Sequence, residues 1–128
     1  MTLAHDERGS SPAEFVMVGA LLTLLTLAVL QLGLAAYVRT VAHDAAVEGA
    51  YHAALADASD AEGAERAREI VERTAGTGFV QDARARRDAS GDGTAVEVSL
   101  RLTLPLAGLA GVPGVWEVTG RAPVDDLD

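Results

Sequence analysis

The stretch FVMVGALLTLLTLAVLQLGLAAYV, residues 15–38, decides the architecture of this chain and contains no charged residue. At a rise of about 1.5 Å per residue, a helix of this length reaches about 36 Å, enough to cross the hydrocarbon core of a bilayer with some tilt. Core helices of soluble domains rarely run this far without a polar face. The stretch therefore predicts a transmembrane helix.

The rest of the chain divides around this helix. Residues 1–9 read as a short polar leader, residues 10–58 as the helix and its extension, and residues 59–128 as a small domain outside the membrane. About ninety residues follow the span, enough for one small domain. The apolar run exceeds the roughly 7–15 residues of a signal peptide, so we do not expect its removal by that route.

Composition narrows the function. The 128 residues carry a formal net charge of −9, with most acids after the span, which argues against nucleic acid or anionic lipid as the partner. The absence of cysteine excludes disulfides and thiolate metal sites. The sequence lacks a nucleophile elbow, a P-loop, a dinucleotide fingerprint and a metalloprotease helix. We expect no enzyme, no cofactor and no small-molecule substrate.

Small residues recur along one side of the long helix. No proline separates the span from residues 39–58, and their alanine content predicts that the helix continues past the membrane. Small side chains at helical spacing let another helix or a sheet approach closely, although glycine and threonine are also simply common in membrane helices. The predicted helix-packing face comprises Gly19, Thr23, Thr26, Gly33, Ala42, Ala46, Gly49 and Ala53.

Two groups of polar residues are candidate cation sites. Glu48 and His52 lie four apart on a helix, but no third ligand is evident, so a solvated face is preferred. Asp88, Ser90 and Asp92 form the first half of a calcium loop, but its twelfth position is a serine. The same residue types suit a hairpin turn, and we expect no metal.

A second helix is predicted after residue 58. Ser59 and Glu62 form a capping box at its start, and Gly76 or Gly78 can close its carboxyl end. Two acid–arginine pairs at i,i+4 are expected on its outer face, Glu62–Arg66 and Glu69–Arg73.

The remaining sequence changes to a period of two. Residues 94–104 alternate cleanly and predict a strand, with weaker strands at 79–87 and 115–124 and a turn at 88–93. The apolar connection at 105–114 either tucks against the core or lies at a membrane or partner surface. Three antiparallel strands with one apolar face need the helices as cover, so the predicted class is α+β. The inward set is Val96, Val98, Leu100, Leu102 and Leu104 on the central strand, then Trp116, Val118, Gly120 and Ala122 on the last.

The start of the apolar run carries a motif with two compatible interpretations. Ser11, Pro12 and Glu14 fit helix positions N-cap, N1 and N3. Gly9 with Glu14 five positions later, directly before a long apolar helix, also resembles a type IV prepilin cleavage site. A peptidase would cut between Gly9 and Ser10, and the new ammonium of a neighbouring subunit would neutralise the Glu14 carboxylate near the membrane.

Taken together, several segments resemble the TadE family of tight-adherence (Flp-type) pilus systems. They are Arg8-Gly9-Ser10, Ala13-Glu14-Phe15, the apolar span, Tyr37-Val38-Arg39 and the run AAVEGA at residues 45–50. The resemblance implies a minor pilin or pseudopilin that functions in type IV pilus assembly and cell adhesion. It also implies a processing site of Gly9, Ser10, Glu14 and Phe15, read by the prepilin peptidase.

The same resemblance implies location and partners. The protein would be a single-pass protein of the cell membrane with its amino terminus cytoplasmic and its domain extracytoplasmic. Its partners would be the major pilin and a second pseudopilin. The alternative is an unprocessed single-span anchor that presents a protein-binding domain in an envelope or secretion complex.

Overall fold

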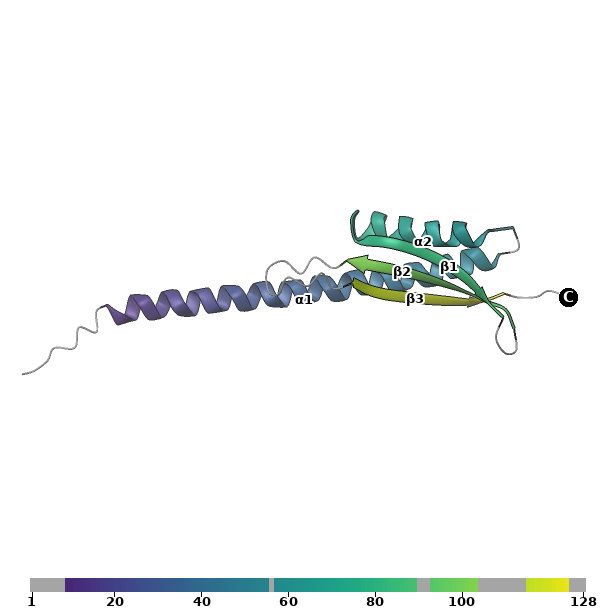
Figure 1. The fold of residues 1–128 in the computed structure, drawn as a ribbon. Helices are drawn as coiled ribbons and strands as arrows, with labels where there is room; N and C mark the ends of the chain where they lie inside the picture. The colour runs from purple at the N-terminus through teal and green to yellow at the C-terminus, as the bar shows by residue number, and fades with distance from the viewer. Residues whose placement is uncertain (1–8, 56, 90–92, 104–114, 125–128) are drawn as a thin grey trace, which may run out of the picture. The chain divides into compact units, whose positions relative to one another are not determined.

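The computed structural model describes residues 9–55, 57–89, 93–103 and 115–124 (Figure 1). The predicted connection at 105–114, Leu104 and the candidate calcium ligands Ser90 and Asp92 lie outside these residues. The fold is the predicted α+β class, with a long apolar helix, a second helix and three antiparallel strands. The elements are α1 (Ser10–Ala54), α2 (Asp60–Thr74), β1 (Val80–Asp88), β2 (Ala95–Thr103) and β3 (Val115–Pro123).

Helix α1 contributes to two compact units, one ending at Leu34 and one beginning at Ala35. The first unit consists, in its described part, of the amino-terminal portion of α1. The second unit holds the rest of α1, α2 and the sheet. The segment predicted as the helix extension is therefore part of the domain, and it ends at Ala54 rather than at residue 58.

The sheet has the strand order β1-β2-β3, with both neighbouring pairs antiparallel. The alternation predicted for the central strand is confirmed, because Val96, Val98, Leu100 and Leu102 are fully buried. On β3 the inward residues Val118, Gly120 and Ala122 are also buried. Trp116, the fourth predicted member of that face, keeps 38% of its surface exposed.

The core between the helices and the sheet is built mainly from small residues on its helical side. Only six large side chains are fully buried in the described part of the chain, and four of them come from β2. The helices contribute alanines and few larger groups, so their backbones lie close to the sheet and to each other. The buried alanines of the helices are Ala42, Ala45, Ala46, Ala50, Ala53, Ala64 and Ala67.

Three glycines make these close approaches possible. A Cβ placed on Gly49 of α1 would lie 2.5 Å from the carbonyl oxygen of Gly63 in α2, and a Cβ on Gly63 would overlap Ala53. A Cβ on Gly120 of β3 would overlap the α1 backbone at Ala46 and Val47. Real Cβ atoms do not approach other atoms this closely, so each site admits only glycine in the observed arrangement.

Helix α2 begins and ends as its sequence predicts. The Ser59 hydroxyl accepts a hydrogen bond from the Glu62 amide at 3.2 Å, and the Glu62 carboxylate accepts one from the Ser59 amide at 2.6 Å, completing the capping box. After the C-cap residue Ala75, Gly76 has a φ of 110°, a left-handed conformation that favours glycine.

The predicted start of α1 is wrong by two residues, because the first helical residue is Ser10 and not Pro12. The helix begins at Ser10, so Ser11 lies inside it instead of capping it from outside. Pro12 tolerates this shift because it still lies in the first turn, where an amide hydrogen has no intrahelical partner.

The two predicted i,i+4 ion pairs of α2 are also wrong. Arg66 reaches Glu48 on α1 instead, at 3.2 Å, while the Glu62 carboxylate is engaged by Ser59. Among the described residues, no ion pair joins Glu69 to Arg73. Arg66 is therefore engaged by Glu48 of α1, and Glu62 by the helix cap, although the two side chains could pair with each other on an isolated helix.

Substitution of Gly120 by alanine tests the close approach of β3 to α1. The new methyl group would overlap the backbone of Ala46 and Val47, and backbone atoms cannot move aside as a flexible side chain can. We expect a loss of about 2 kcal/mol in the free energy of unfolding. The measurement is urea unfolding of the full chain in a mild detergent, followed by the fluorescence of Trp116.

Gly93→Ala is the matched control. A Cβ on Gly93 would meet nothing within 4 Å. The control should change the unfolding free energy by less than about 0.5 kcal/mol. Equal losses in the two variants would show that the glycine contact does not limit the packing.

Candidate functional site

The predicted processing residues lie at the very start of α1. Gly9 is in a turn, and Ser10 is the first residue of the helix, so the peptide bond between them lies at the junction of turn and helix. Ser10, Glu14 and Phe15 are all exposed, with Phe15 exposing 80% of its surface. The four residues are thus accessible from solvent in the described chain.

The segment that follows is a helix with large apolar side chains around its whole circumference. Its most apolar 18-residue window has a mean hydropathy of 2.3, and none of that window is buried in the structure. By length and composition the helix is long and apolar enough to cross a membrane. Large apolar side chains that are exposed here include Phe15, Val16, Met17, Leu21, Leu22, Leu24, Leu25, Leu27, Leu30, Leu32 and Leu34.

Two threonine side chains of this segment bond within the helix. The Thr23 hydroxyl donates to the Gly19 carbonyl and the Thr26 hydroxyl to the Leu22 carbonyl, each at 2.8 Å. These bonds satisfy the hydroxyl donors without water, as an apolar surrounding requires. A Cβ on Gly19 or Gly33 would meet nothing within 4 Å, so both positions are open.

The predicted helix-packing face therefore divides into two parts. Gly19, Thr23, Thr26 and Gly33 are exposed, and their contact with partner helices stays a prediction. The other four small residues, in the domain part of α1, are buried against this chain's own α2 and sheet, which already occupy that side of the helix. This buried set is Ala42, Ala46, Gly49 and Ala53.

The outer face of the sheet carries a network of alternating charges. Glu97 on β2 forms ion pairs with Arg86 of β1 at 3.6 Å and with Arg121 of β3 at 2.5 Å. On β1, Arg84 pairs with Asp82 at 2.6 Å. The strand register puts Arg86 and Arg121 opposite Glu97 on either side, which sequence reasoning did not identify. Such a balanced, solvated face is typical of an antiparallel sheet with one covered side.

The candidate site at Glu48 and His52 gains no further ligand among the described residues, and the candidate calcium loop lies partly outside them. Glu48 pairs with Arg66 across the helices. Within the described ranges, no group of three or more His, Cys, Asp or Glu residues is arranged to hold a metal ion.

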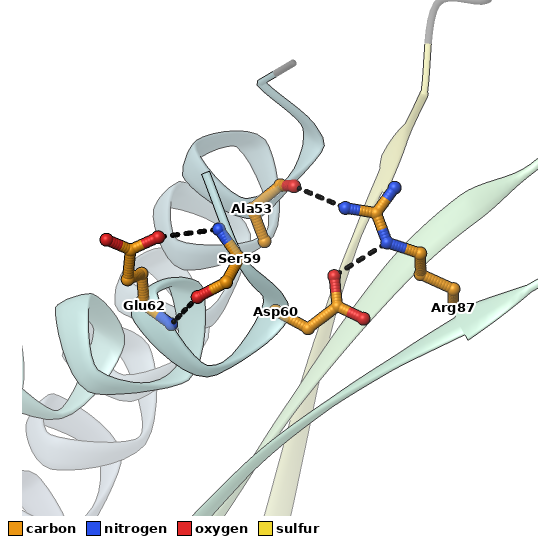
Figure 2. A network of polar contacts seen from close by, with 5 residues as sticks. All are labelled: Ala53, Ser59, Asp60, Glu62 and Arg87. Carbon is orange, nitrogen blue, oxygen red and sulfur yellow. Dashed lines mark hydrogen bonds and ion pairs between the residues drawn. The ribbon is translucent and has the colours of Figure 1, made fainter. Parts of the chain in front are cut away.

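A second polar network, at the turn between the two helices, ties three elements together (Figure 2). Arg87 lies near the end of β1 and points toward the helices. Its Nε donates to Asp60 Oδ1 at 2.7 Å, and its Nη2 donates to the Ala53 carbonyl at 3.1 Å. The first contact holds the start of α2, and the second satisfies a carbonyl in the last turn of α1 that lacks an intrahelical partner.

The capping box beside Arg87 changes the acidity of one carboxyl group. The pKa of Glu62 is lowered below its ordinary value of 4.5, mainly because the Ser59 amide donates to the carboxylate and secondarily because of the Ser59 side chain. The charged form of Glu62 is therefore favoured in the folded state.

Comparison with known proteins finds a family match that includes the start of α1 and the apolar segment. The model of the TadE-like protein family matches residues 9–50. The match runs from the glycine before α1 to the buried alanine face, and it confirms the resemblance predicted from the sequence over that range. No curated protein and no solved structure matches the chain significantly.

Replacing Arg87 by methionine should loosen the junction of the helices with β1. The variant loses the ion pair to Asp60 and the bond to the Ala53 carbonyl while keeping an unbranched side chain of similar length. Both charged side chains are partly exposed, so solvent screening reduces the effect to about 1 kcal/mol in the free energy of unfolding. Urea unfolding of the full chain in detergent measures this loss.

Arg84→Met provides the matched control on the same strand. Arg84 lies on the outer face, is more exposed than Arg87 and pairs only with Asp82 in the described structure. Its replacement should change stability by less than about 0.5 kcal/mol. A loss as large as that of Arg87→Met would contradict the assigned role of Arg87.

The lowered pKa of Glu62 predicts how its contribution to stability depends on pH. Because the folded pKa lies below the ordinary 4.5, the contribution is complete above pH 4.5 and is lost as the pH falls through the folded pKa. The urea midpoint of Glu62→Gln should be below that of the natural chain at neutral pH. The two midpoints should converge as the pH falls below the folded pKa of Glu62.

Ser59→Ala distinguishes this charge effect from capping in general. It removes the hydroxyl that accepts from the Glu62 amide, a bond without a titrating group, and with it the secondary contribution of Ser59 to the lowered pKa of Glu62. Because the amide bond is lost at every pH, the variant should be destabilised both at neutral pH and below the folded pKa of Glu62. A Glu62→Gln difference that does not change with pH would contradict the charge effect.

Proposed function

Since residues 9–50 match the TadE-like family, we propose that this chain is a pilin-like structural subunit of a tight-adherence pilus system. In this role it is a minor pilin or pseudopilin held in the membrane by the amino-terminal part of α1. The observation that carries the proposal is the coincidence of the family match with an exposed apolar helix that starts directly after Gly9.

The start of α1 supports processing by a prepilin peptidase. The bond between Gly9 and Ser10 lies where the turn meets the helix, and its flanking residues are exposed. Cleavage there would leave an ammonium group on Ser10, followed by Glu14 and then by the apolar run. A carboxylate at the edge of hydrocarbon costs several kcal/mol unless it is paired, and the ammonium of a neighbouring subunit supplies the opposite charge.

The rest of the chain supports a structural role. The outer sheet face is a balanced charge network, and the polar groups around Arg87 hold elements together. We propose that the amino terminus lies in the cytoplasm and the domain outside the membrane. The proposed partners are the prepilin peptidase, the major pilin and a second pseudopilin of the same system.

The amino terminus of the protein isolated from its own membranes tests the proposal. We expect the chain to begin at Ser10, because the peptidase cuts after Gly9. In Gly9→Val the branched side chain should block the cut, so the leader should remain. Intact mass and amino-terminal sequencing measure both, and Glu7→Gln, a leader change outside the motif, should be cleaved normally.

Glu14→Ala separates cleavage from assembly within the same test. This variant should still begin at Ser10, yet the number of pili on the cell should fall about tenfold or more, because the pairing charge is gone. A natural chain that keeps its leader on fully assembled pili would contradict the prepilin role. It would favour the unprocessed single-span anchor that presents a binding domain.

A further inference from the structure

We propose that Trp116, together with Tyr37 and Arg39, anchors the domain in the headgroup layer of the membrane. We call these three residues the aromatic collar. The occupant of this surface is the layer of lipid phosphates and carbonyls on the side where α1 leaves the bilayer. The inference rests on the proposed insertion of the apolar run and adds a second attachment to it.

Two members of the collar follow the apolar run directly in the sequence of α1. Tyr37 and Arg39 lie three and five positions after Leu34, the last residue of the exposed apolar unit. Both are exposed, whereas Val38 between them is fully buried in the domain core. The helix thus changes from apolar to aromatic and basic surface within about 8 Å along its axis.

Tertiary structure adds the third member from far along the chain. Trp116 is the second residue of β3, and the guanidinium carbon of Arg39 lies 5.1 Å from the centroid of its ring, within the range of a cation–π contact. This contact places the indole beside the α1 residues that follow the apolar run. On another side of α1, the Tyr37 hydroxyl donates to the Thr74 carbonyl at the end of α2, at 3.5 Å.

The position of Trp116 in the sheet predicts a buried side chain, but the side chain is partly exposed. It faces the helical side and lies opposite the fully buried Leu102, yet 38% of its surface is exposed. Val115 beside it is exposed as well. Among the described residues the apolar surface at this end of the domain is therefore only partly covered, by Arg39 over the Trp116 ring, while the corresponding surface further along β3 is buried by α1.

The chemistry of the collar matches the membrane interface. Tryptophan and tyrosine concentrate there, because each combines an apolar ring with a hydrogen-bonding group. Arginine can extend its charged head toward lipid phosphates while its stem covers apolar surface. The net charge of −9 opposes general adsorption to anionic lipid, so the rings and the tether of α1, rather than the overall charge, hold the collar in place.

Because Trp116 is the only tryptophan in the chain, its fluorescence reports directly on the collar. The full chain is reconstituted in phosphatidylcholine vesicles, some of which contain lipids with a nitroxide quencher near the headgroup. Aqueous iodide serves as the opposing quencher. We expect strong quenching of Trp116 by the lipid nitroxide and weak quenching by iodide.

A variant with the tryptophan moved to Tyr51 is the matched control. In Trp116→Phe with Tyr51→Trp, the new indole lies on α1 at a position that is 56% exposed, more than Trp116. Solvent exposure alone therefore predicts equal or greater iodide quenching there. We expect the ratio of lipid to iodide quenching to be roughly threefold or more higher for Trp116 than for the indole at position 51.

Flotation of the vesicles after an alkaline wash tests the membrane insertion of α1 separately from the aromatic collar. A chain that fails to float with the vesicles would overturn both the membrane insertion and the collar. A chain that floats but shows the same quenching ratio at both positions would overturn the collar alone. Circular dichroism of both samples checks that the control has the natural secondary structure.

Discussion

The close contact of the α1 backbone with α2 and β3 constrains the rest of the domain. At Gly49, Gly63 and Gly120 a single additional carbon would overlap neighbouring atoms. Helices that approach this closely can carry only small residues on the facing side, which accounts for the alanines of the core. Since alanine buries little apolar area, the large side chains that a small core needs come from the central strand, which contributes Val96, Val98, Leu100 and Leu102.

This packing divides α1 into two parts along its length, and their side chains differ in size and exposure. The carboxyl-terminal part buries small residues against the chain's own domain, so that side of the helix is not available to another subunit. The amino-terminal part exposes large apolar residues in every direction and bonds its threonine hydroxyls to its own backbone. One continuous helix thus combines a segment suited to lipid or partner helices with a segment that completes a folded domain.

Polar residues complete the structure at the points where the apolar pattern ends. Arg87 on β1 points toward the helices and binds the Ala53 carbonyl at the end of α1 and the Asp60 carboxylate at the start of α2. Backbone groups at helix ends lack helical partners. Glu97 lies between two arginines from both neighbouring strands. These contacts position the elements relative to one another within the domain. The ion pairs of Glu97 lie on the outer face of the sheet, as expected for a face that meets water.

The sequence by itself determined three features whose signal is local. The apolar run, the capping box at Ser59 and the period-two alternation of β2 each depend on residues within one element, and all three are present in the structure. Only the tertiary structure decided which distant groups meet: Arg66 with Glu48 instead of Glu62, Arg87 with the helix ends, and Trp116 with Arg39. The physical reason is that side-chain partners are chosen by the register of strands and the approach of helices, which spacing along one element does not encode.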